Sequence, residues 1–96
     1  MLLVQVTYTM RPGQREGFLK MVRETGILQA VREEPGCLSY AYYLPEEDDG
    51  TLLLVERWTD AQAQQAHSDT PHMKRFGELK PQYVADTKLI FCPLED

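Results

Sequence analysis

The stretch that decides the fold is CLSYAYYLPEEDDGTLLLVERW, from Cys37 to Trp58. Two apolar runs with the length of strands, 37–44 and 51–58, flank an acidic segment over 45–50 that contains Pro, Asp and Gly. Asp and Gly tolerate the positive φ angles of tight turns, so we expect such angles here. The stretch therefore predicts a hairpin of two antiparallel strands.

The second strand of this hairpin carries apolar side chains on both of its faces. By alternation, one face holds Leu52, Leu54, Glu56 and Trp58, and the other holds Leu53, Val55 and Arg57. A strand that is apolar on both faces is typical of a sheet covered on both sides.

Helical and strand patterns lie on either side of the hairpin. Residues 2–10 alternate between apolar and polar and predict a strand. One apolar stripe runs through residues 14–33 and predicts a single helix, within which Gly26 is expected to allow close packing on a sheet. After the hairpin we expect a short helix ending at His67, a helix from Pro71 to between residues 81 and 83, and a strand over 87–92.

The order βαββααβ predicts one α+β domain, residues 1–96, with a ferredoxin-like antiparallel sheet. Right-handed crossovers place the strands in the spatial order fourth, first, third, second. Helices cover only one face of such a sheet, which leaves Leu53, Val55 and Ile90 on the other. We expect a homodimer through this sheet face, with two-fold symmetry.

Charge and composition exclude several classes of function. The net charge of -5 disfavours nucleic-acid binding through phosphate contacts, and no apolar run reaches the roughly 18 residues that span a membrane. The opening MLLVQVTYTM lacks the basic start of a signal peptide and is expected to form a strand. The two cysteines form no CxxC pair, which favours reduced thiols and a cytoplasmic location.

Candidate chemical groups gather in ERWTDAQAQQAHSDTPHMKRF, from Glu56 to Phe76, which holds the only Trp and both His residues. Glu56 is either a structural ion pair or a buried acid with a raised pKa. His67 and His72 are each a general base or a capping residue, and Trp58 is a pocket wall or a core aromatic. Tyr8 and Tyr40 face inward, as pocket phenols or as sheet packing. No third ligand stands at a fixed offset from the two His residues, so we expect no metal site.

Three segments carry a resemblance to a known family: RPGQREGFLKMV, EEPGCLSYAYY and VERWTDAQAQQAHSDTPHMKRF. With them the chain resembles the antibiotic biosynthesis monooxygenase family, which includes small quinol monooxygenases. The resemblance implies a dimeric α+β barrel. It also implies that a hydroxylated aromatic small molecule is oxidised by O₂ without a metal, flavin or haem cofactor.

The resemblance also implies a pocket between the sheet and the helices. His67 is then the base or proton relay and Trp58 the wall for the substrate ring, and the residues around the substrate are Tyr8, Tyr40, Leu54, Glu56, His72 and Phe76. Aromatic-oxidising members carry Asn where this sequence has Leu54, and haem-degrading members carry Asn where it has Val6, which disfavours haem degradation. A non-oxidative isomerase, or a dimer that processes or binds a small metabolite in the same pocket, remains the alternative.

Overall fold

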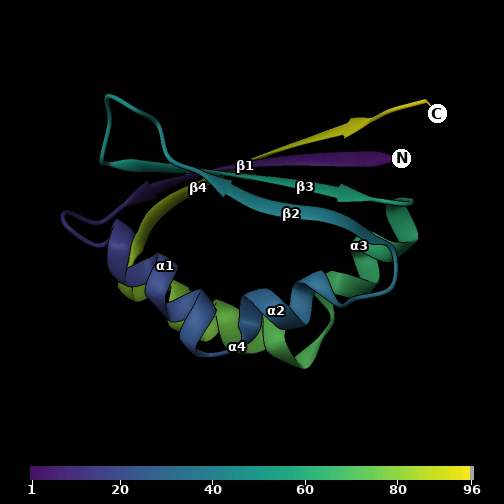
Figure 1. Cartoon of the computed structure of the whole chain (residues 1–96), viewed down its shortest axis with the longest axis horizontal. Helices are drawn as coiled ribbons and strands as arrows, with labels where there is room; N and C mark the ends of the chain where they lie inside the picture. Colours follow the sequence, from purple (N-terminus) through teal and green to yellow (C-terminus); the bar gives the residue numbers. More distant parts are fainter. Residues whose placement is uncertain (96) are drawn as a thin grey trace.

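The computed structural model describes residues 1–95 and contains a four-stranded antiparallel sheet with helices on one face (Figure 1). The sheet order is β2-β3-β1-β4, which confirms the predicted order and the ferredoxin-like α+β fold. The elements are β1 (Leu2–Met10), α1 (Arg15–Glu24), α2 (Ile27–Arg32), β2 (Cys37–Tyr43), β3 (Thr51–Trp58), α3 (Ala61–Ser68), α4 (Pro71–Leu79), the 3₁₀ helix η1 (Lys80–Gln82) and β4 (Val84–Pro93).

The hairpin between β2 and β3 forms as predicted, but its turn is held differently. Every φ over residues 45–50 is negative, so the expectation of positive φ angles was wrong. Asp48 supplies the constraint, because its carboxylate accepts hydrogen bonds from the Gly50 amide at 2.7 Å and from the Thr51 hydroxyl at 3.0 Å. An Asx-type bond of this kind closes a turn without a left-handed residue.

The core lies between the helices and the inner face of the sheet. Alternate residues of β1 and β3 are buried there, and α1 adds Phe18, Met21 and Val22 at helical spacing. Phe18 is fully buried, and its ring contacts four other aromatic rings, with centroids 5.3 to 6.2 Å away, from Tyr8, Tyr42, Phe76 and Tyr83.

The predicted single helix over 14–33 is two helices, α1 and α2, which meet at Gly26. Gly26 has a φ of 79°, a left-handed conformation that is unfavourable for residues other than glycine. A Cβ there would meet no atom within 4 Å, so Gly26 serves the bend and not the close packing that we expected. The bend turns α2 so that Ile27, Leu28 and Val31 also reach the core.

The outer face of the sheet carries no helix (Figure 1). Leu53 and Val55 are half-buried there, and Ile90 is 59% exposed. β4 begins three residues earlier than predicted, at Val84, because it pairs with β1 along nearly the whole of that strand. Among the described residues, no helix is long and apolar enough to cross a membrane.

Candidate functional site

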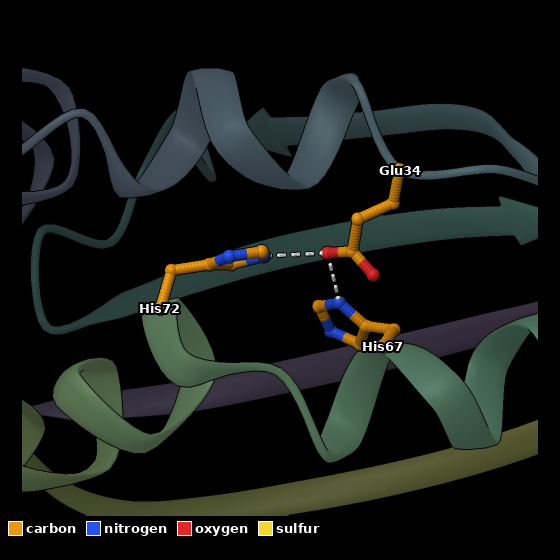
Figure 2. Close-up of side chains that lie close together, drawn as sticks. All are labelled: Glu34, His67 and His72. Carbon is orange, nitrogen blue, oxygen red and sulfur yellow. Dashed lines mark hydrogen bonds and ion pairs between the residues drawn. The ribbon is translucent and has the colours of Figure 1, made fainter.

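Two imidazoles from separate helices converge on one carboxylate oxygen of Glu34 (Figure 2). Glu34 follows α2, His67 lies in the last turn of α3, and His72 lies in the first turn of α4. His67 Nδ1 and His72 Nε2 each lie 2.8 Å from Glu34 Oε2. The His67 side chain is 4% exposed, that of Glu34 9% and that of His72 23%. The cluster is therefore mostly desolvated, and His72 is the member nearest to solvent.

Gly36 explains how Glu34 reaches the two histidines. A Cβ on Gly36 would lie 2.5 Å from the Cβ of Ala63 and 2.8 Å from the Thr59 hydroxyl, so only glycine allows this approach. The Thr59 amide donates to the Gly36 carbonyl at 2.9 Å. The turn after α2 thus docks on the start of α3, which holds Glu34 over that helix.

A single turn between α3 and α4 positions both imidazoles. Asp60 caps α3 by accepting from the Ala63 amide at 2.8 Å. The Thr70 hydroxyl donates to the His67 carbonyl at 2.9 Å and accepts from the Met73 amide at 3.3 Å. Pro71 then opens α4, where its missing N–H costs nothing. These bonds cap both helices and fix the turn between His67 and His72.

The contact with Glu34 selects one tautomer of His67. An ionised carboxylate only accepts hydrogen bonds, so the nitrogen facing it must carry the hydrogen. Neutral His67 then has N–H at Nδ1 and a free lone pair at Nε2. A carboxylate that orients an imidazole in this way is the usual support for a general base.

Trp58 and Glu56 lie on the sheet side of His67. The Trp58 ring lies 4.7 Å from the His67 ring, centroid to centroid, and its Nε1–H donates to Glu56 Oε1 at 3.0 Å. Glu56 is 5% exposed, and burial raises the pKa of its carboxyl, although the Trp58 bond and His67 act in the opposite direction. Glu56 is thus a buried acid whose only hydrogen-bond donor among the described side chains is Trp58.

A cavity of about 350 Å³ opens between α3, α4 and the β1–β4 side of the sheet. The residues that line it include four site candidates from the sequence, Tyr8, Glu56, His67 and Phe76. Its apolar lining comes from Val4, Val6, Met73, Leu89 and Phe91, and its polar lining includes Gln64, Ser68, Lys80 and Thr87. Burial raises the pKa of Tyr8 well above its ordinary value, so this phenol is a neutral hydrogen-bond donor near pH 7.

The other four candidates do not line this cavity. Tyr40, Leu54 and Trp58 are buried in the core, and Tyr40 and Trp58 contact the His67 ring. His72 meets Glu34 on the far side of His67. Burial also raises the pKa of Tyr40 well above its ordinary value, which keeps the phenol neutral. The structure therefore places Trp58 behind His67 rather than in direct reach of a bound molecule.

Sequence reasoning missed Glu34, which contacts both histidines. It lies 33 positions before His67 and 38 before His72, and no spacing rule links such groups. The signal available was its place in EEPG, directly before the Pro-Gly that ends the helical pattern. A second hollow of about 370 Å³ borders β2, lined by Arg32 and residues 37–41, but the Arg32 side chain is already bonded to the Tyr40 carbonyl.

The raised pKa of Glu56 predicts a pH-dependent stability. Between the unfolded pKa, about 4.3, and the higher folded pKa, the native state binds more protons than the unfolded state. Native stability is therefore lost as pH rises through this window. Glu56→Gln keeps an acceptor for Trp58 and removes the titration. The free energy of unfolding of this variant, relative to that of the wild type, should therefore increase as pH rises from about 4 to 7. Urea unfolding at several pH values measures this, with exposed Glu16→Gln as the control; a difference independent of pH would contradict it.

The geometry and the sequence together place the chain in a known family. Residues 1–79 match the family model described as antibiotic biosynthesis monooxygenase. Because this match covers most of the chain, the protein belongs to that family, and the resemblance noted from the sequence is confirmed.

The sequence identity between this chain and each individual relative is low. An uncharacterized protein from Synechocystis sp. is 30% identical over 84 residues, which are 88% of this chain and 56% of the relative, so the chain spans little more than half of that protein. A protein of Escherichia coli named "Probable quinol monooxygenase YgiN" is 29% identical, over 81% of this chain and 83% of its own. A crystal structure described as an antibiotic biosynthesis monooxygenase has 26% identity and a TM-score of 0.85, with all of both chains covered. The family description and the names of the Escherichia coli relative and of this solved structure each contain the word monooxygenase.

Proposed function

We propose that this protein is a cofactor-independent monooxygenase that oxidises a quinol or polyphenol with O₂. One observation carries the proposal: a buried imidazole, oriented by Glu34, borders a cavity with apolar and polar lining, next to a buried acid and a neutral phenol. The name of the Escherichia coli relative supports the substrate class. The cavity has the size of a small-molecule site, since ligand pockets span roughly 300–1,000 Å³.

The first step is removal of a phenolic proton by His67. Nε2 has the free lone pair, because Nδ1–H is bonded to Glu34. The resulting phenolate is electron-rich and transfers one electron to O₂, and the substrate radical then combines with superoxide at a ring carbon. The peroxide anion takes the proton back from His67, then loses water and leaves a carbonyl. For a hydroquinone the balance is one O₂ consumed, with one oxygen atom in the hydroxyquinone and one in water.

The other cavity residues have roles that follow from their chemistry. Tyr8 donates a hydrogen bond to a second substrate oxygen, since its phenol is neutral. Apolar Val6 and Phe76 hold the ring and exclude water, which favours reaction of the radical pair over release of superoxide. Trp58 and Glu34 act through His67, as positioning residues.

Oxygen uptake tests this function. With a panel of hydroquinones, the protein should consume O₂ faster than each compound autoxidises, and a variant lacking the His67 base should not. The matched control is Glu33→Gln, which changes an exposed carboxylate next to Glu34. Uptake equal to autoxidation for every quinol would reject the monooxygenase. If the same compounds were instead isomerised without O₂, the pocket base would serve a non-oxidative reaction.

The protein is a homodimer in this proposal, with the outer sheet faces opposed. Leu53, Val55 and the exposed Ile90 are apolar, and the helices leave that face uncovered. A second copy buries it with two-fold symmetry. Light scattering should give twice the 11.1 kDa chain mass at micromolar concentration, and the mass of a single chain would count against the dimer.

A further inference from the structure

We infer that Glu34, His67 and His72 form a binding site for a divalent transition-metal ion of the Zn²⁺ class. Their three ligand atoms all lie within 4.8 Å of one another, and they come from three different segments (Figure 2). Nothing in the proposed oxygen chemistry requires this ion. The inference therefore stands beside the proposed function and does not depend on it.

The donor set selects the class of metal. Two imidazole nitrogens and one carboxylate oxygen suit Zn²⁺ and its first-row neighbours, whereas Ca²⁺ and Mg²⁺ prefer oxygen ligands alone. His₂Glu is a known ligand set of catalytic zinc sites, in which a fourth position stays open for water. Here the 23% exposure of the His72 side chain gives the ion and that water a route from solvent.

The distances fit a site that is hydrogen-bonded when the metal is absent. Metal–ligand bonds of about 2.0–2.1 Å around a tetrahedron place ligand atoms roughly 3.3 Å apart. The two N···O distances are now 2.8 Å, so Glu34 Oε2 would withdraw by about 0.5 Å to admit the ion. His67 is fixed by the Trp58 ring and by Thr70, so His72 and Glu34 make the adjustment.

Charge and burial also favour a cation. Metal coordination requires unprotonated imidazole nitrogens, and with these the two imidazoles and one carboxylate give a site of charge -1 within a chain of formal charge -5. The cluster is shielded from water, with side-chain exposures of 4% and 9% for His67 and Glu34, and this strengthens attraction to a divalent ion. Both nitrogens lie 2.8 Å from the carboxylate oxygen, and metal coordination would require a lone pair on each of them in place of an N–H group.

Metal at this site has a consequence for the pocket. Coordination through Nδ1 moves the proton of neutral His67 to Nε2, so the ring has no free lone pair left for a substrate. The metal-bound protein should therefore lose the base that the proposed function uses. The ion would act as an inhibitor of that reaction rather than as its cofactor.

Direct binding of Zn²⁺ tests the inference without any activity assay. The chain is stripped with a chelator, and Zn²⁺ is then titrated by calorimetry and by equilibrium dialysis. We expect one ion per chain and a rise in melting temperature, because the metal binds the native state. Co²⁺ should give the intense visible bands of a four-coordinate site.

Variants locate the ion. His72→Gln and Glu34→Gln should each weaken Zn²⁺ binding at least about 10-fold, as losses at metal sites commonly do. Glu33→Gln, one position away and exposed, should bind as the wild type does. Lack of stoichiometric binding at 100-fold excess over micromolar protein, or binding that neither ligand variant weakens, would overturn the inference. These outcomes are read without substrate, so a failed oxygen assay leaves them unaffected.

Discussion

Replacing His67 by asparagine is expected to lower quinol turnover by about 10²-fold or more, the usual contribution of a general base. The asparagine amide can still donate a hydrogen bond in the direction of Nδ1, toward Glu34, but it has no basic atom in place of Nε2. The measurement is the turnover rate at saturating quinol, corrected for autoxidation.

A second substitution separates chemistry from folding at this position. His67→Gln carries its amide farther out, near the place of Nε2, and is equally unable to accept a proton at neutral pH. Both variants should lose turnover while their melting temperatures differ, because only asparagine keeps the contact with Glu34. Retained turnover together with a large fall in melting temperature would instead make His67 a structural residue.

Replacing Trp58 by alanine is expected to cost about 3–5 kcal/mol of unfolding free energy, as for other large aromatic residues in cores. Trp58 is fully buried, so its removal leaves a cavity beside His67 and under the end of β3. It also leaves the buried Glu56 carboxyl without its donor. Urea unfolding, with the slope held common between variants, measures the loss.

Trp58→Phe divides this cost into its two parts. Phenylalanine keeps an aromatic ring against His67 and most of the buried volume, and it removes the N–H that Glu56 accepts. A buried acceptor without its partner costs about 1–3 kcal/mol, so the phenylalanine variant should fall between wild type and alanine. If phenylalanine cost nothing, the Trp58–Glu56 bond would have no part in stability.

The fold followed from the sequence wherever one local rule governed an element. Alternation over residues 51–58 placed Leu52, Leu54, Glu56 and Trp58 on the buried face, and Thr70-Pro71 marked the start of α4. The bend at Gly26 was missed because the apolar stripe continues across it, from Val22 to Leu28. Hydrophobic spacing predicts which residues are buried. It does not predict where a residue adopts a left-handed φ and the chain bends.

The candidate site was predictable only in part, for a different reason. Glu56 stood out because its strand face predicted burial, and His67 because an imidazole can act as a base near neutral pH; the structure places both at the cavity. Glu34 did not stand out, since its role depends on a turn that Gly36 seats against Ala63. That contact joins segments far apart in the chain, and periodicity carries no information about it.

Labelled oxygen tests the central claim most directly. The protein is mixed with a hydroquinone that it consumes, under ¹⁸O₂ in unlabelled water. The reaction is quenched at once, and the mass of the product is measured by mass spectrometry. A monooxygenase that uses the His67 pocket should yield hydroxyquinone with one ¹⁸O atom per molecule, and His67→Asn should yield only the autoxidation background. A product that carries no label, or that forms equally fast without O₂, would contradict the account.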